Sequence, residues 1–123
     1  LFVSYQKDSS PIFGLDSFCE VMLGSWNGGK RNNAIALSKG IRWNFHGKSY
    51  ACFKPGGAYV THTSSNTGTH LQFALDFALG TRRENIDLSV SFKHFSNGKK
   101  IFHWTHHSNK GENFVTLQAG YLF

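Results

Sequence analysis

Long apolar runs are missing from this chain of 123 residues: no stretch of eighteen consecutive apolar residues occurs. A transmembrane helix is therefore excluded. Cysteine is scarce too, and Cys19 and Cys52 are too few for a disulfide scaffold, so we leave both unpaired. Charged residues make up only 16% of the chain, whereas an ordinary soluble domain has roughly 25%. The length suits a single domain, residues 1–123.

Positive charge and aromatic rings are what the chain has in excess. Thirteen Lys and Arg against seven Asp and Glu give a net charge of +6, which favours an anionic partner such as nucleic acid, a phosphorylated lipid or a membrane surface. Aromatic residues reach 15%, twelve of them Phe. Their alternation along whole segments fits lipid contact better than the stacking surfaces of single-stranded nucleic-acid binding. We therefore expect no nucleic-acid partner.

Apolar residues recur with a period of two in several segments, which predicts β-strands. Short turns, at 46–49 and 80–85, alternate with longer connections at 26–33, 61–69 and 97–112. Counting back from the C-terminus gives six strands and a partial seventh near Leu1 to Tyr5. The six expected strands are Ser17 to Trp26, Ala34 to Phe45, Tyr50 to Thr61, Leu71 to Gly80, Ile86 to Ser96 and Asn113 to Phe123.

Short turns at one end and long loops at the other are typical of outer-membrane barrels, of which the smallest have eight strands. We therefore predict an all-β, antiparallel, eight-stranded outer-membrane β-barrel that lacks one N-terminal strand in this chain. The faces opposite the apolar ones carry mostly Ala, Gly and Ser with charges such as Asp76 and Arg42, which suits a narrow barrel interior. An aromatic girdle is expected from Trp43, Phe45, Tyr50, Tyr121 and Phe123. The alternative is a soluble sandwich or barrel with its apolar faces inside.

Two polar residues continue the apolar face of the segment from Ile86 to Ser96. Every even position from Ile86 to Phe92 is apolar, and His94 and Ser96 follow on the same parity. A serine hydroxyl is a weak nucleophile until a base removes its proton, and the base in turn needs an orienting acceptor. The last segment runs antiparallel to this one, which brings Asn113 near the pair. Asn97 or nearby backbone N–H groups are candidates for stabilising an oxyanion.

These residues resemble a known family. His94-Phe95-Ser96-Asn97 is similar to the H-x-S-N motif of the outer-membrane lipid A 3-O-deacylases, and Asn109-Lys110-Gly111-Glu112-Asn113 resembles their N-x-G-x-E element. The segment from Phe53 to Ala58 and the C-terminal Gly120 to Phe123 fit as well. The resemblance covers the C-terminal two-thirds. It implies an outer-membrane barrel in bacteria with a Ser-His-Glu site on its lipid-facing wall.

The resemblance also implies the chemistry of the site. Ser96 would be the nucleophile and His94 the base, with Asn97, Asn109 and Gly111 supporting the oxyanion and the site. The reaction would be hydrolysis of the ester-linked acyl chain at position 3 of lipid A, with lipopolysaccharide and outer-membrane lipids as partners. No metal or organic cofactor is implied.

One departure from the family pattern concerns the acidic member of the triad, because Asn113 stands at that position. Adjacent Glu112 points inward by strict alternation, and a bulge would be needed to turn it outward. Two hypotheses remain open: Glu112 substitutes through a bulge, or Asn113 leaves a weakened enzyme. The second of these allows a structural or lipid-binding barrel, and a soluble basic barrel that binds an anionic ligand is a third reading.

The loop between the two motifs is rich in basic residues and histidines. Lys99, Lys100 and Lys110 are placed to meet the phosphates of lipid A, whereas Arg82 and Arg83 lie in a turn at the opposite end. A second H-x-S-N match, from His106 to Asn109, ranks well below the first because too few residues follow it. Zinc binding by His103, His106 and His107 ranks below a solvated loop, since no tetrahedral set is evident. We leave a homodimer open.

Overall fold

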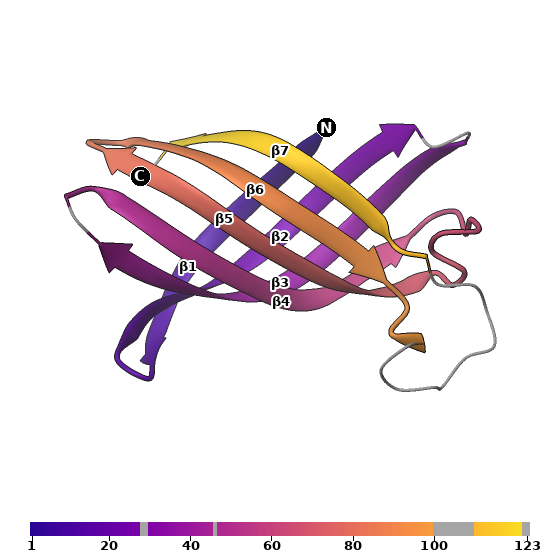
Figure 1. Ribbon diagram of the computed structural model, residues 1–123, viewed down its shortest axis with the longest axis horizontal. Coiled ribbons are helices and arrows are strands. Elements are labelled where there is room, and N and C mark those ends of the chain that lie inside the picture. The colour runs from indigo at the N-terminus through magenta and orange to yellow at the C-terminus, as the bar shows by residue number, and fades with distance from the viewer. Residues whose placement is uncertain (28–29, 46, 100–109, 122–123) are drawn as a thin grey trace.

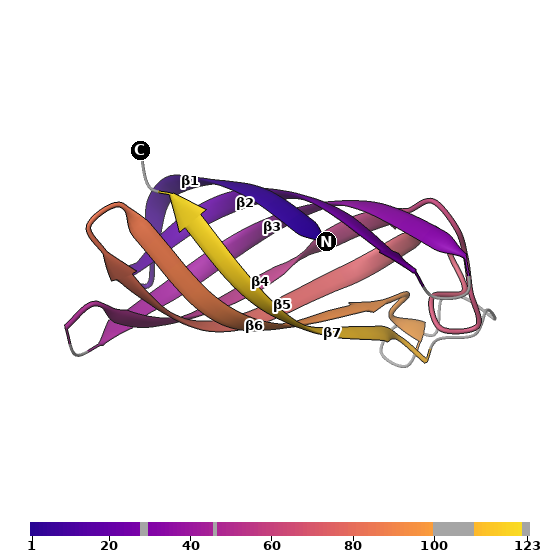
Figure 2. The same ribbon diagram turned by 90° about the horizontal axis from the view of Figure 1, so that it is seen from above.

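The chain folds into one curved antiparallel sheet. The computed structural model describes residues 1–27, 30–45, 47–99 and 110–121. Seven strands pair in their sequence order, with β1 and β7 at the edges, and Figure 1 and Figure 2 show how strongly the sheet curls. The described residues contain no helix long and apolar enough to cross a membrane. The strands are β1 (Phe2–Ile12), β2 (Leu15–Asn27), β3 (Arg31–Phe45), β4 (Ser49–Val60), β5 (Leu71–Arg83), β6 (Ile86–Ser96) and β7 (Glu112–Tyr121).

The prediction of an antiparallel all-β chain is confirmed, but one detail of it is wrong. The N-terminal segment is a full strand of eleven residues that pairs with β2, not a partial one. The sheet is not closed, since no backbone pairing joins β1 to β7 in the described part of the chain. Its two edges nevertheless approach each other, because the ring centroids of Phe2 on β1 and Phe114 on β7 are 5.2 Å apart.

The connections differ at the two ends of the sheet. Short connections join β1 to β2, β3 to β4 and β5 to β6 at one end of the sheet, which we call the short-turn end. The sequence separations from β4 to β5 and from β6 to β7 are longer, and these strands are joined at the other end, which we call the long-loop end (Figure 1). The long connection expected at 26–33 is wrong, because β2 and β3 stay paired as far as Asn27 and Arg31. The pairing therefore leaves only three residues between the two strands, too few for a long loop.

The apolar faces of the strands point outward. On β5 and β6, Phe77, Leu79 and Val90 are each about half exposed, whereas the inward residues Lys54 and Asp76 are 1% and 7% exposed. This arrangement is the reverse of a soluble protein, which buries apolar side chains and exposes charged ones. The predicted orientation is confirmed, and the reading as a soluble barrel with an apolar interior is wrong.

The charged groups inside the sheet neutralise one another. Lys54 from β4 forms ion pairs with Glu20 on β2 at 3.0 Å and with Asp76 on β5 at 2.8 Å. Lys93 on β6 also pairs with Asp76. Because a buried charge is costly unless it is paired, these contacts hold four strands together across the interior.

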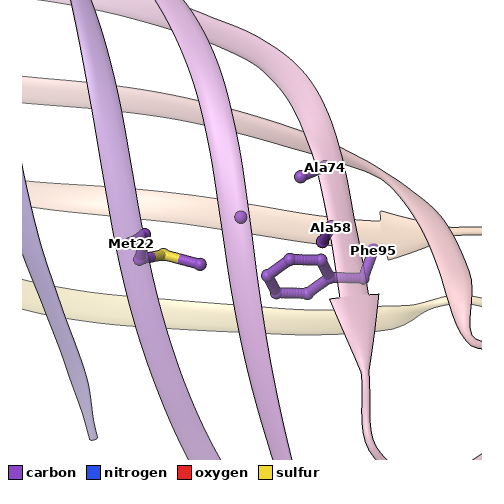
Figure 3. Close-up of a cluster of buried hydrophobic side chains, with 5 residues drawn as sticks. Met22, Ala58, Ala74 and Phe95 are labelled. Carbon is purple, nitrogen blue, oxygen red and sulfur yellow. The ribbon is translucent and has the colours of Figure 1, made fainter.

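An apolar cluster lies beside this network, toward the long-loop end. Figure 3 shows Met22 and Phe95 pointing toward each other across the interior, with Ala58 and Ala74 between neighbouring strands. The small alanines leave room for the larger side chains, as a narrow curved sheet requires. The ring of Trp26 stacks on Phe95 with centroids 5.8 Å apart. This cluster packs behind the strands that carry the candidate site.

The expected aromatic girdle is only partly right. Trp43, Phe45 and Tyr121 are exposed near the short-turn end, as predicted. Tyr50 instead lies inside, 5% exposed, because it occupies an inward position of β4 and donates a hydrogen bond to Asp87. Phe123 lies outside the described residues.

Both cysteines are free thiols.

Candidate active site

The histidine and serine singled out by the sequence lie on the outer face of the sheet at the long-loop end. His94 and Ser96 follow the exposed Val90 and Phe92 on β6, and Ser96 is the last residue of that strand. Both are partly exposed. Residues two apart on a strand are separated by roughly 6.6 Å, so the two side chains stand next to each other on one face. The pair therefore faces whatever surrounds the sheet, not its interior.

Asn113 orients the histidine. In the β6–β7 ladder Asn113 is directly opposite His94, and its Oδ1 lies 2.7 Å from His94 Nδ1. With Oδ1 as the acceptor, Nδ1 carries the proton, and the lone pair is left on Nε2. Nε2 is then free to act as a base. This is the tautomer that a serine nucleophile needs.

Ser96 stands next to His94 on this face, but the two side chains are not hydrogen-bonded to each other. Within the described residues Ser96 Oγ makes no hydrogen bond to the His94 ring. Catalytic hydrogen bonds are often long in the absence of substrate and tighten when it binds. The arrangement thus supplies a nucleophile, a base and an orienting acceptor on one face.

Gly111 makes room for the histidine ring. Its φ is +80°, a left-handed conformation that glycine adopts readily. A Cβ on this residue would lie 2.6 Å from His94 Cε1, closer than such contacts allow. The absence of a side chain at Gly111 therefore sets the distance between the His94 ring and the chain that enters β7.

Glu112 lies on the other side of β7 from the histidine. It pairs with Phe95 in an unbroken β6–β7 register, so the bulge that would turn it outward is absent. It lines an open pocket of about 360 Å³ at the mouth of the interior, together with Trp26 and His62. Its Oε1 accepts a hydrogen bond from Asn66 Nδ2 at 3.4 Å. Of the two candidates for the third member, only Asn113 contacts His94.

Asn66 was not among the residues that the sequence pointed to. It belongs to the β4–β5 connection, and its backbone oxygen accepts the Gly111 N–H at 2.8 Å. Hydrogen bonds of Ser64 and Thr67 shape this loop, with Ser64 Oγ accepting the N–H groups of Asn66 and Thr67. The turn-rich composition of the segment predicts a loop but carries no signal for its partner across the barrel mouth.

The other expected site residues are spread around the end of β6. Asn97 is fully buried, and its Oδ1 accepts the Lys99 N–H at 3.1 Å. Lys99 is partly exposed and Lys110 is exposed. Lys100 and Asn109, with the second H-x-S-N match and its histidines, lie outside the described residues. No group of three or more metal-ligating side chains occurs among the residues that the structure does describe.

A family model described as lipid A 3-O-deacylase (PagL) matches residues 1–122. The chain belongs to this family. Searches of curated proteins and of solved structures found no match. The resemblance read from two motifs in the C-terminal part therefore extends over essentially the whole chain, including β1 and β2, where no motif had been recognised.

Membership of the lipid A 3-O-deacylase family explains why the apolar faces of the strands point outward. The family consists of outer-membrane hydrolases with a β-barrel fold. An apolar outer wall and a paired polar interior are what such a barrel requires, because lipid surrounds it and no water is available there to solvate charge. His94, Ser96 and Asn113 lie on that outer wall, where lipid would contact them.

Proposed function

We propose that this chain is a lipid A 3-O-deacylase of the bacterial outer membrane, with residues 1–123 forming one barrel domain. The observation that carries the proposal is the 2.7 Å contact between His94 and Asn113, beside Ser96, on the apolar outer face. An ester that lies among the acyl chains of a lipid reaches this face without leaving the membrane. No cofactor is needed for hydrolysis by a serine.

The reaction divides between the three residues. His94 Nε2 takes the proton of Ser96 Oγ as the oxygen attacks the ester carbonyl, and then returns it to the departing sugar oxygen. His94 then takes a proton from a water molecule as its oxygen attacks the acyl carbon, the bond to Ser96 Oγ breaks, and His94 returns the proton to Ser96 Oγ as the free acid leaves. Asn113 holds the imidazole in position throughout.

Support for the transition state comes from the loop that follows Ser96. We assign Asn97 and Asn109 to the neighbourhood of the oxyanion, and Gly111 to positioning of His94, since its own N–H is already bonded to Asn66. Lys99, Lys100 and Lys110 are assigned to the phosphates of lipid A, because lysines at the long-loop end offer the charge that phosphate binds. The intact substrate is lipopolysaccharide.

A second candidate function follows from Asn113 itself. A neutral amide orients the histidine but stabilises an imidazolium less than a carboxylate does. An impaired family member that only binds lipid is therefore the alternative.

The two functions are separated by replacing the nucleophile. Purified protein in detergent is incubated with lipid A, and mass spectrometry records loss of one acyl chain. We expect Ser96→Ala to lower the rate by at least about a thousandfold while the barrel stays folded. Equal rates for wild type and Ser96→Ala would show that any deacylation arises elsewhere. No deacylation by the wild type would favour the lipid-binding alternative.

A further inference from the structure

Two lysines interrupt the apolar outer wall on strands β1 and β3, which are distant in sequence from the candidate site. Lys7 on β1 and Lys39 on β3 are both in register with Cys19 on β2, so the two lysines flank one position of the wall. Lys7 shares the parity of the exposed Val3 and Tyr5, because the even residues of β1, such as Gln6, bond inward. Both ammonium groups therefore belong to the face that meets lipid.

Apolar side chains lie on either side of these lysines along the strands. Toward the long-loop end the same face carries the exposed Val21 and Leu37, and toward the short-turn end it carries Trp43 and Phe45. A lysine in the middle of a barrel's lipid face is destabilising, far more so than one near the membrane interface. The ammonium groups of Lys7 and Lys39 therefore need an anionic partner that offsets the cost of placing them on this face.

The part of the chain that the structure describes supplies no such partner. In the described residues neither lysine forms an ion pair, whereas the inward Lys54 and Lys93 are both paired with carboxylates. The acids of the described strands all occupy inward positions: Asp8, Asp16, Glu20, Asp76, Asp87 and Glu112. The outer wall thus carries cations without anions, and the balancing charge has to come from outside the chain.

The direction of the Lys39 side chain indicates at which end of the sheet the balancing negative charge lies. Its Nζ donates a hydrogen bond to Ser9 Oγ on β1. In the strand register, Ser9 is opposite Ser17 of β2, and Ser17 is opposite Ile41 of β3. Ile41 lies two residues beyond Lys39 toward the short-turn end. The ammonium group therefore leans toward that end, as long cationic side chains do when they reach for a membrane interface. Ser9 adds a hydroxyl beside it.

We propose that Lys7 and Lys39 form a site on the outer wall for the phosphate of an anionic glycerophospholipid from the leaflet at the short-turn end. The site takes an anion because two lysines without ion-pair partners flank one position of the wall, with a hydroxyl beside one of them, and a lipid because the wall around it is apolar. It lies on β1–β3, away from His94 and Ser96, and it depends on the membrane placement proposed above but not on the esterase reaction.

The test counts bound lipid by native mass spectrometry of the full chain released from detergent micelles. Phosphatidylglycerol, phosphatidylcholine and lipid A are titrated separately. Wild type is expected to retain phosphatidylglycerol in preference to phosphatidylcholine. Because each of the two lysines adds to the attraction of an anionic lipid, Lys7→Gln/Lys39→Gln is expected to weaken phosphatidylglycerol binding by roughly tenfold or more.

The matched control removes the same charge elsewhere at the same end. Lys48 and Arg83 are exposed in or beside short turns, and Lys48→Gln/Arg83→Gln is expected to keep the preference. Lys7→Arg/Lys39→Arg keeps it too. Should the double Gln variant fail to fold, Lys7→Gln alone, at an exposed edge position, gives the same reading with a smaller effect. Equal loss of phosphatidylglycerol in the control, no preference for phosphatidylglycerol over phosphatidylcholine in wild type, or an equal loss of lipid A in the double Gln variant would each overturn the proposal. Deacylation is unaffected by any of these results.

Discussion

At the residue scale, the candidate site depends on three residues placed around one imidazole. Asn113 fixes the tautomer of His94, Gly111 fixes the place of its ring, and Ser96 stands two residues along the same strand face. Each residue acts locally, and each can be changed without touching the interior network that holds the strands together. The site is therefore open to point substitution in a folded barrel.

A carboxylate in place of Asn113 should raise the rate. A hydrogen bond to a charged group is worth about 1 kcal/mol more than a neutral one, so Asn113→Asp, which keeps the shape of the side chain, is expected to increase kcat roughly fivefold. Asn113→Glu tests the longer family side chain. Deacylation kinetics on lipid A provide the measurement, and unchanged kcat in both variants would remove Asn113 from the third position.

A methyl group on Gly111 should displace the histidine. Gly111→Ala combines backbone strain of about 1–2 kcal/mol with a clash against the His94 ring. Gly47 is the matched control, because its φ is +71° and a Cβ there would contact nothing within 4 Å. We expect Gly111→Ala to lower kcat at least about tenfold relative to Gly47→Ala, since small misplacements of catalytic groups are costly. Equal activity of the two variants would contradict the positioning role.

At the element scale, the β6–β7 ladder decides which residues can take part in chemistry. The unbroken register places Asn113 outward and Glu112 inward, so adjacent residues in one motif have opposite surroundings. The β4–β5 connection then holds the start of β7 through Asn66. The order of the strands thus brings three distant segments to one end of the sheet.

Removing the charge of Glu112 should leave the reaction nearly unchanged. Glu112→Gln keeps an oxygen that accepts from Asn66, so we expect kcat within about twofold of wild type. Asn66→Ala removes the donor instead and is expected to lower kcat severalfold, because the entry to β7 loses a restraint. A large loss in Glu112→Gln would instead make Glu112 the acidic member of the site.

Parity along single strands was enough to predict much of this arrangement. The alternation from Ile86 to Ser96 placed His94 outward, and the charges of Asp76 and Arg42 among small residues predicted an interior of this kind. The packing of Gly111 against His94, the reach of Asn66 and the inward Tyr50 were not predictable. They depend on which strands curl to face each other, and that information is not contained in any one segment.

At the scale of the whole molecule, stability comes from an interior where apolar and ionic layers succeed each other. Lys54 lies between Glu20 and Asp76 and is 1% exposed, so it links β2, β4 and β5 from within. The outer wall contributes little to this cohesion, because its side chains face outward. The ionic layer is therefore the part of the interior most sensitive to substitution.

Breaking the ionic layer should destabilise the barrel without changing the site. Lys54→Ala leaves Glu20 without its cation and Asp76 with Lys93 alone, and removing one partner of a buried pair costs about 3–5 kcal/mol. The exposed Lys48→Ala is the control, expected within about 0.5 kcal/mol of wild type. Urea unfolding in detergent, followed by tryptophan fluorescence, measures both, and equal midpoints would show that the network contributes nothing.

The central claim is that the strand face carrying His94 and Ser96 is the face that meets lipid. Spin labels at successive positions of β6, from Leu88 to Phe92, test it in reconstituted vesicles once Cys19 and Cys52 are replaced. The account predicts high collision rates with oxygen dissolved in the bilayer at Leu88, Val90 and Phe92, and low rates at Ser89 and Ser91. The opposite alternation, or no alternation, would contradict it.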